Sequence, residues 1–184
     1  MTIQSLRCLG AFLNYYKPSG RIADYGGTDR IGAPIVKKML ALNNVVVKDD
    51  DPGVVFNLHI QGVEKKVVPQ YVVLDYDSGV DLLKPIRGKK FDAGICMDLL
   101  EHVSNPFIVA KNISNSLQKN ALLFVTAPWI WEIHEYPKDY WRFSPQGIQE
   151  LFPDMKALHV EIIRDESSDE ELPRARIVAI FKKK

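Results

Sequence analysis

Two apolar runs of the sequence each end in an acidic residue that could bind a ligand or transfer a proton. The runs are YVVLD at 71–75 and FDAGICMD at 91–98, and Glu101 and His102 follow the second run. Both runs show little alternation of polar and apolar residues, so we expect two strands inside a sheet, covered on both faces. Carboxylates accept hydrogen bonds, and an imidazole with a pKa near neutrality can move a proton. The spacing therefore predicts a polar site at the ends of these strands.

A pair of glycines follows an earlier strand-like run. RIADY at 21–25 predicts a short strand, Gly26 and Gly27 come directly after it, and Pro34 then opens a helix. Glycine lets the backbone approach a ligand closely, and free N–H groups near a helix N-terminus favour a carboxylate or phosphate. The pattern predicts a ligand-binding corner, although a tight turn without a ligand would produce it too.

Asp75 is the residue that we expect to bind a ribose. Its carboxylate offers two oxygens to a vicinal diol, so this acid and the glycine corner together describe a nucleoside site. The usual spacing of about 20 residues from a glycine loop to a ribose-binding acid points instead to Asp49 or Asp50. We favour Asp75 because a buried strand leads directly into it, while a role as a turn residue stays open.

Three residues are candidates for proton transfer: His102, His134 and Asp139. His102 follows a predicted strand and the other two lie in an aromatic loop, where each could instead brace the local structure. Glu101, His102 and His134 could also assemble a metal site, but their spacing is not diagnostic of one. The sequence therefore predicts catalytic candidates and no metal site.

The segment 129–143, WIWEIHEYPKDYWRF, is rich in aromatic and charged residues. Its rings could stack on a planar acceptor or attract a cation, while any individual ring could instead pack the segment onto the sheet. We name this segment the aromatic lid and expect it as a whole to be functional. Its aromatic members are Trp129, Trp131, Tyr136, Tyr140, Trp141 and Phe143.

The elements that must position these residues alternate between strands and helices. Apolar spacing predicts a leading helix within 1–20, and Asn105 before Pro106 and Ser144 before Pro145 predict the starts of two more helices. The last two strands have no helix between them and should pair antiparallel. The predicted strands are 21–25, 45–47, 54–60, 71–75, 91–98, 121–128, 157–163 and 174–181. The fold class is therefore α/β, a Rossmann-like doubly wound, mostly parallel sheet with helices on both faces and a C-terminal antiparallel β-hairpin.

The length and the charge of the chain limit the number of domains and the kinds of partner that we expect. The 184 residues fit a single domain over 1–184, large enough to bury its core without disulfides or metals. The formal charge of +1, with acids and bases interspersed, lacks the footprint of a nucleic-acid binder, so a small-molecule partner is expected. Cys8 and Cys96 match no metal-ligand spacing and are expected to be reduced.

No apolar stretch reaches the roughly 18 residues of a membrane span, which favours a cytoplasmic protein without a membrane partner. The sequence leaves the oligomeric state open.

Four segments resemble the class I S-adenosylmethionine-dependent methyltransferases, particularly the broad type 11-like group. They are DYGGTD at 24–29, YVVLDYDSGVDLL at 71–83, FDAGICMDLLEHVSNP at 91–106 and YPKDYWRFSPQGIQELF at 136–152. The likeness covers most of the chain from residue 21 onward. It implies S-adenosyl-L-methionine as the cofactor and methyl transfer to a small-molecule or sugar-like acceptor.

The resemblance also implies which residues border the cofactor. Asp24, Gly26 and the loop after them would contact its methionine end, Asp75 would hold its ribose, and the aromatic lid would cover the acceptor side. The full set implied is Asp24, Tyr25, Gly26, Gly27, Thr28, Asp75, Tyr76, Asp98 and Leu99. The sequence departs from the family pattern at Thr28, where a second spaced glycine is usual, and an Ala-Pro pair before the helix lengthens the loop.

Two alternatives to a methyltransferase are weighed. A domain of the same fold that binds a ligand without catalysis fits the altered glycine loop and the compact size of the chain. A nicotinamide-dependent oxidoreductase shares the early strand and acid, but the spaced G-x-G-x-x-G is absent and a closing hairpin is not expected for it. The methyltransferase is therefore favoured, with the non-catalytic domain as the alternative.

Overall fold

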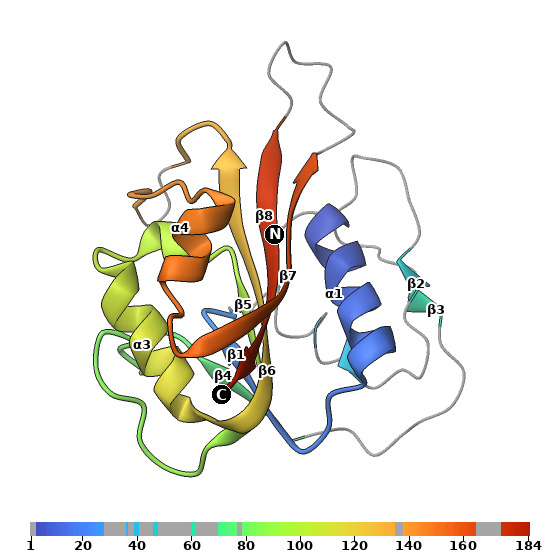
Figure 1. The fold of residues 1–184 in the computed structure, drawn as a ribbon, viewed down its shortest axis with the longest axis vertical. Coiled ribbons are helices and arrows are strands. Elements are labelled where there is room, and N and C mark those ends of the chain that lie inside the picture. Colours follow the sequence, from blue (N-terminus) through green and yellow to red (C-terminus); the bar gives the residue numbers. More distant parts are fainter. Residues whose placement is uncertain are drawn as a thin grey trace.

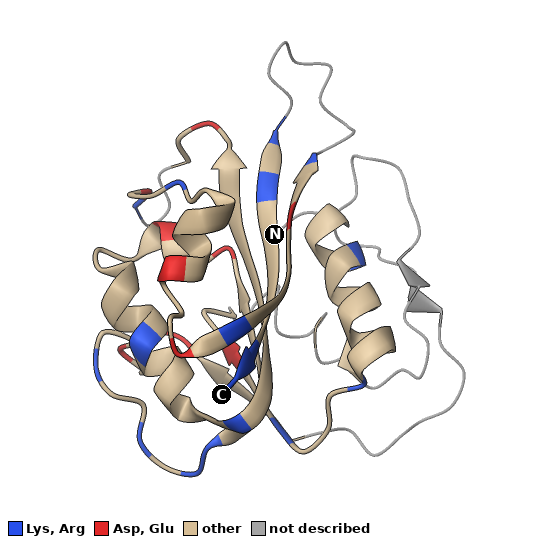
Figure 2. Ribbon diagram, in the orientation of Figure 1, with Lys and Arg blue, Asp and Glu red and all other residues tan. Residues whose placement is uncertain are grey.

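A computed structural model of the chain places a mixed sheet between two layers of helices (Figure 1). Basic and acidic residues are interspersed over the described elements (Figure 2). No helix in the described part of the chain is long and apolar enough to cross a membrane. The structure describes residues 3–27, 36, 39–40, 46–47, 60–61, 70–76, 79–134, 138–164 and 174–184.

Six strands form the main sheet: β1 (Arg21–Tyr25), β4 (Gln70–Leu74), β5 (Phe91–Met97), β6 (Leu117–Ile130), β7 (Met155–Arg164) and β8 (Ala175–Lys183). Their order across the sheet is β4-β1-β5-β6-β8-β7. The first four strands in this order pair parallel, whereas β8 pairs antiparallel with both β6 and β7. The predicted α/β class with a C-terminal antiparallel pair is confirmed.

Helices cover both faces of this sheet. α1 (Ile3–Tyr16) lies on one face, and α3 (Pro106–Ser116) and α4 (Pro145–Glu150) lie on the other (Figure 1). Both later helices start where the sequence predicts. Asn105 accepts a hydrogen bond from the Ile108 amide at 3.1 Å, and Ser144 accepts one from the Gly147 amide at 3.0 Å. A proline at the first helical position has no amide to satisfy, so each helix begins directly after its capping residue.

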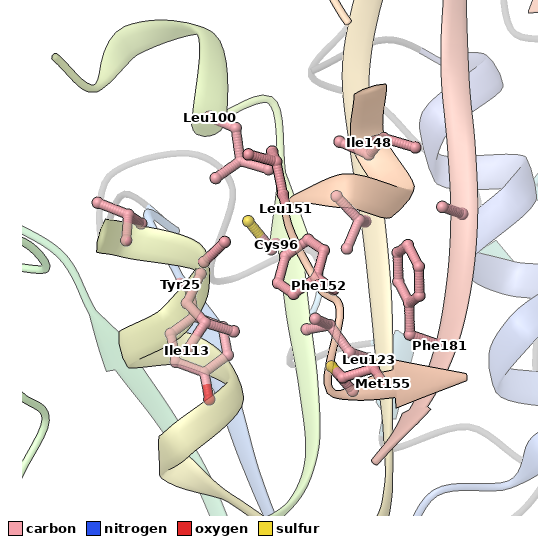
Figure 3. Close-up of a cluster of buried hydrophobic side chains, with 14 of the residues drawn as sticks. Tyr25, Cys96, Leu100, Ile113, Leu123, Ile148, Leu151, Phe152, Met155 and Phe181 are labelled. Atoms are coloured by element: carbon pink, nitrogen blue, oxygen red, sulfur yellow. The ribbon is translucent and has the colours of Figure 1, made fainter. Parts of the chain in front are cut away.

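Alternate residues of each strand pack against opposite helix layers. In β1, Ile22 belongs to the apolar cluster beneath α1, whereas Tyr25 belongs to the cluster beneath α3 and α4. Figure 3 shows the second cluster, whose labelled members are Tyr25, Cys96, Leu100, Ile113, Leu123, Ile148, Leu151, Phe152, Met155 and Phe181. Because helices cover both faces, the ends of the parallel strands are the place where a ligand can reach the sheet.

β4 and β6 differ most from the prediction, while β7 starts two residues earlier and β8 ends two residues later than predicted. β4 is the edge strand of the described sheet and 70–73 are exposed or half buried, so the prediction that 71–75 lies inside the sheet is wrong. Tyr71 and Val72 pack against the clusters on opposite faces, which explains the apolar run although the outer edge is unpaired in the described sheet. β6 begins at Leu117 rather than at the predicted residue 121. The sequence pattern missed this start because residues 118–120 are exposed and carry no apolar strand signal.

Predictions for 28–70 fall largely outside the described residues. Val36, Met39 and Leu40 are helical and buried, which agrees with a helix after the glycine loop. β2 (Val46–Val47) and β3 (Ile60–Gln61) form a separate antiparallel pair. β2 lies within the predicted strand 45–47, whereas β3 shares only Ile60 with the predicted strand 54–60, whose other residues lie outside the described part. Residues 79–90 form turns and irregular structure, so no helix lies in this described part of the connection between β4 and β5.

Candidate functional site

The strands β1, β4 and β5 end beside one another at one edge of the sheet. Tyr25 pairs with Leu74 on one side and with Cys96 on the other, so the residues that follow these strands are neighbours. The Gly26 amide donates a hydrogen bond to the Leu74 carbonyl at 2.9 Å, which holds the glycine corner against the end of β4. We name this edge the strand-end site.

Gly26 is required at this corner by its backbone and by its surroundings. Its φ of +75° lies in the left-handed region that residues with a side chain rarely adopt. A Cβ atom at this position would lie 2.7 Å from Cδ1 of Leu99. The corner after β1 and the predicted cofactor residue Leu99 after β5 are therefore in direct contact.

Asp24 provides a buried carboxyl group at the strand-end site. It is 3 % exposed, accepts a hydrogen bond from the Tyr71 hydroxyl, and lies against the position that a side chain on Gly27 would occupy. Burial raises the pKa of Asp24 to about 6, while the Tyr71 hydrogen bond opposes the shift and the negative charge of Asp75 adds to it. A ligand cation next to this group would stabilise its ionised form.

Asp75 and Tyr76 follow β4 directly and differ in exposure. Asp75 is buried, whereas Tyr76 is 86 % exposed. The Asp75 carbonyl accepts a hydrogen bond from the Val80 amide at 2.9 Å, which shapes the turn after the strand. A carboxylate inside the edge can bind a vicinal diol, and an aromatic ring outside it can stack on a planar base.

The side chain of Tyr25 points into the protein interior rather than toward the strand-end site. It is fully buried in the cluster beneath α3 (Figure 3). Its hydroxyl oxygen lies 2.6 Å from that of Ser116. Only the backbone of Tyr25 therefore lies beside the glycine corner. Thr28 and the lid residues 135–137 are outside the described residues.

Asp98 follows β5 as predicted, but an internal ion pair holds its carboxylate. Arg176 in β8 donates to both carboxylate oxygens, at 2.9 and 3.1 Å, and the Thr126 hydroxyl donates to one of them at 2.9 Å. Arg176 also donates to the Ser5 hydroxyl of α1 at 2.6 Å. Burial works to raise the pKa of Asp98, but the charge of Arg176 and the hydrogen bonds outweigh it and hold this pKa below its usual range.

Glu101 and His102 lie in η1 (Leu100–His102), a turn of 3-10 helix after β5. Nδ1 of His102 lies 2.7 Å from the Lys138 carbonyl oxygen. Because a carbonyl only accepts, Nδ1 is the donor, and in the neutral imidazole the lone pair lies on Nε2. Glu101 is 1 % exposed, burial raises its pKa to about 8, and the charge of Asp98 adds to the shift.

His134 in the aromatic lid is held by Asp139 and Arg142. The His134 amide donates to Oδ2 of Asp139 at 3.0 Å, and Nδ1 of His134 lies 3.1 Å from the same oxygen. Arg142 donates to both carboxylate oxygens of Asp139 and to the carbonyls of Trp131 and Glu132. The hydrogen bonds from Arg142 lower the pKa of Asp139 to about 2, so this carboxylate is better suited to orient His134 than to transfer a proton.

The structure brings two of the predicted catalytic residues together. The ring centroids of His102 and His134 are 5.0 Å apart, with the rings nearly perpendicular at 82°. The Tyr140 amide also donates to the Glu101 carbonyl at 2.8 Å, so the aromatic lid is tied directly to η1. The histidines therefore share one small region between η1 and the lid.

Several rings of the aromatic lid contact the rest of the protein. Trp131 lies against the guanidinium groups of Arg174 and Arg176, at 5.1 and 4.8 Å from its ring centroid. Nε1 of Trp141 donates to the Val103 carbonyl at 2.9 Å. These contacts anchor the lid on the sheet, which is the packing role that the sequence left open for individual rings.

Sequence reasoning missed the roles of Arg176, Thr126 and Arg142. Arg176 interrupts the apolar run RARIVAIF, and a lone charge in a buried strand is a signal that it has a buried partner. Asp98, which lies 78 residues away along the chain, could not be identified as that partner without the strand order.

No protein-family profile and no curated protein matches this sequence. Solved structures match along nearly its whole length. The N-methyltransferase NodS from Bradyrhizobium japonicum WM9, in complex with S-adenosyl-L-homocysteine, has a TM-score of 0.60 at 10 % identity, over 98 % of this chain and 86 % of NodS. The 1,6-didemethyltoxoflavin-N1-methyltransferase from Burkholderia thailandensis, with bound 1,6-didemethyltoxoflavin and S-adenosylhomocysteine, has a TM-score of 0.62 at 10 % identity, over 97 % and 78 % of the two chains. The cyclase SpnF has a TM-score of 0.61 at 13 % identity, over 97 % and 79 %.

At such low identities the likeness concerns the arrangement of the elements. It extends over the six-stranded sheet, the helices on both faces and the antiparallel final strands. The chain therefore has the fold of the class I S-adenosylmethionine-dependent methyltransferases.

Proposed function

We propose that this chain is an S-adenosylmethionine-dependent methyltransferase that acts on a small-molecule acceptor. The observation that carries the proposal is the strand-end site, where Asp24, Asp75 and the Gly26 corner lie together. Ligands of open α/β sheets bind beyond the carboxyl ends of the strands, where this site lies. Two solved structures of the same fold hold S-adenosylhomocysteine, which supports this cofactor class.

The groups at the strand-end site fit the parts of the cofactor. The Asp75 carboxylate suits the two ribose hydroxyls, and the exposed Tyr76 ring beside it suits the adenine base. The Asp24 carboxyl suits the positively charged amino group of the methionine end, which would favour ionised Asp24. Gly26 lets the backbone pass close to the ligand because it has no side chain.

The bound cofactor supplies a methyl group that is already activated on a sulfonium, so the chain mainly has to align the acceptor and exclude water. A base is useful where the acceptor is a hydroxyl or a protonated amine. His102 and His134 are the proposed bases. In both residues Nδ1 lies beside an oxygen that only accepts hydrogen bonds, so Nε2 is left to take a proton.

The aromatic lid is the segment that would hold the proposed small acceptor. Arg142 and Trp141 anchor the lid, and the Lys138 carbonyl brings it to His102. Tyr140 and Trp141 are partly exposed, and their rings could stack on a planar acceptor. An acceptor held between this lid and the strand ends would lie next to the two histidines.

Calorimetry with S-adenosylmethionine and S-adenosylhomocysteine tests the cofactor, with NADH as a matched adenosine-containing control. We expect both sulfur compounds to bind and NADH not to bind. Failure of both sulfur compounds to bind would contradict the proposal.

A panel of small hydroxyl and amine acceptors then tests methyl transfer. SpnF, a cyclase, shares the fold, so the fold alone does not establish this reaction. Cofactor binding without transfer to any acceptor would favour the alternative, a domain that binds the ligand without catalysis.

A further inference from the structure

Glu101, His102 and His134 converge on a single point between η1 and the aromatic lid. Each residue offers one potential ligand atom, and the three atoms all lie within 4.8 Å of one another. Glu101 Oε1 is 3.8 Å from Nε2 of His102. We name these three residues the His-His-Glu cluster.

Hydrogen bonds outside the cluster orient both imidazoles. Nδ1 of His102 is bound to the Lys138 carbonyl, and Nδ1 of His134 lies within reach of Asp139 Oδ2 and of the Glu132 carbonyl. All three acceptors favour the tautomer with its proton on Nδ1, which in the neutral ring leaves the lone pair on Nε2. Metal-binding histidines are held in this way, by a carboxylate or a backbone carbonyl on the other ring nitrogen.

Asp139 is itself held in place. Arg142 donates to both of its carboxylate oxygens, and the His134 amide donates to Oδ2. The acid that orients His134 is therefore fixed by three further hydrogen bonds. Such outer contacts keep a ligand imidazole in position before an ion arrives.

Glu101 adds a buried carboxyl group to the cluster, and one of its oxygens has no hydrogen-bond partner among the described residues. The residue is 1 % exposed, and the oxygen concerned is Oε2. A buried carboxylate needs compensation, usually a cation or donors from the protein. Among the described residues, no hydrogen-bond donor compensates this Oε2 atom.

We propose that Glu101, His102 and His134 bind a single divalent transition-metal ion of the zinc type. Two imidazole nitrogens and one carboxylate oxygen form a three-ligand set that leaves a fourth position open, as in catalytic zinc sites. Magnesium and calcium prefer sets made only of oxygen ligands, so the two nitrogens disfavour them.

Only a small adjustment separates the cluster from a bound geometry. Ligand atoms around tetrahedral zinc are about 3.3 Å apart, given metal–ligand distances of about 2.0 to 2.1 Å. The ligand atoms would therefore have to approach one another by at most about 1.5 Å, with the Nδ1 contact of His134 to Asp139 kept. The His134 side chain is 38 % exposed, so of the two histidines it is the one less enclosed by the protein.

The ion site does not depend on the proposed methyl transfer. With an ion bound, both imidazoles become ligands, and activation of an acceptor hydroxyl would pass from the histidines to the open position on the ion. Metal binding and cofactor binding can therefore be measured separately, and either can fail without the other.

The test is titration of the metal-stripped protein with Zn²⁺ by calorimetry, with Co²⁺ as a spectroscopic probe and Mg²⁺ at equal concentration as the comparison ion. We expect one Zn²⁺ per chain, visible absorption from bound Co²⁺, and no binding of Mg²⁺. His102→Ala and His134→Ala should each abolish the Co²⁺ signal. His159→Ala is the matched control, since His159 is exposed on β7 and pairs with Glu161.

Asp139→Asn tests the outer contact, and the expected loss of Zn²⁺ affinity is about 10- to 100-fold. Circular dichroism establishes that each variant is folded, and His134→Ala, which changes a partly exposed side chain, carries the test if Glu101→Gln or His102→Ala does not fold. Absence of Zn²⁺ binding, or equal loss in His134→Ala and His159→Ala, would overturn the proposal.

Discussion

Arg176 and Asp98 form a buried ion pair in which Nη1 of the arginine donates to both carboxylate oxygens, at 2.9 and 3.1 Å. The two residues belong to β8 and to the end of β5, with β6 between these strands, so the pair spans the middle of the sheet. Both side chains are largely buried.

Arg176→Met should lower the free energy of unfolding by about 3 to 5 kcal/mol, because it leaves a buried carboxylate without its cation. Urea denaturation followed by circular dichroism measures this change. The double variant with Asp98→Asn removes both charges, and asparagine tolerates the φ of +48° at this position. It should be more stable than Arg176→Met alone; equal stability would mean that the stranded charge is not the cause.

Gly26→Ala and Gly79→Ala form a matched pair of substitutions. Both glycines have a left-handed backbone, with φ of +75° and +80°, so alanine costs about 1 to 2 kcal/mol at each for this reason. A Cβ at 26 would also lie 2.7 Å from Leu99, whereas nothing lies within 4 Å at 79. We therefore expect the larger loss of stability from Gly26→Ala, measured by urea denaturation.

Leu99→Ala in the Gly26→Ala background provides the control for that contact. It should recover part of the difference between the two glycine variants, because the clashing atoms are removed. Identical losses at 26 and 79 would show that the glycine corner does not press against Leu99.

Because of Asp24, the free energy of unfolding should fall as the pH rises from about 4 to about 6. Its pKa is raised from an ordinary 3.8 to about 6, so the folded protein holds more protons than the unfolded chain in this window. The protonated Asp24 carboxyl contributes about 3 kcal/mol to the free energy of unfolding. This contribution is fully present below about pH 4 and is lost above about pH 6. Urea denaturation of the natural protein and of Asp24→Asn across this range measures the difference.

Asp24→Asn should remove that pH dependence, because asparagine does not titrate. Subtracting its stability curve from that of the natural protein cancels the other titrating groups. A difference that stays constant from pH 4 to 6 would contradict the raised pKa.

Asp75→Ala should weaken binding of S-adenosylhomocysteine by about 1 to 3 kcal/mol, or roughly 5- to 150-fold in Kd, since the ribose loses a charged acceptor. Calorimetry measures the affinity. Asp81→Ala is the matched control, because Asp81 lies nearby in sequence but its side chain is 40 % exposed and pairs with Lys84. An unchanged Kd for Asp75→Ala would contradict Asp75 as the ribose-binding acid and would favour Asp49 or Asp50 instead.

Local signals in the sequence predicted the elements better than the contacts between them. β1 has its predicted bounds of 21–25, and Asn105 and Ser144 cap their helices as predicted, because capping and apolar spacing depend on a few adjacent residues. The edge position of β4 and the pairing of Arg176 with Asp98 depend on the order of the strands. That order emerges only when the whole chain packs.

At the candidate site too, the sequence predicted individual residues but not the contacts between them. The sequence identified the residues after each strand, and the structure places Gly26, Asp75 and Leu99 at neighbouring strand ends. It also named His102 and His134, but their approach depends on the path of the aromatic lid, which Arg142 fixes through carbonyls that carry no sequence signal. Backbone acceptors of this kind cannot be inferred from residue types.

β8 is the last strand along the described chain, yet it lies between β6 and β7. Until it inserts, β6 has an open edge on that side, β7 has no strand to pair with, and the seven buried residues 175–181 have no place in the core. Open strand edges recruit other chains, so newly synthesised protein that stalls before this insertion would aggregate. Substitutions that slow the arrival of this strand should therefore reduce the yield of folded protein more than they reduce the stability of the molecules that do fold.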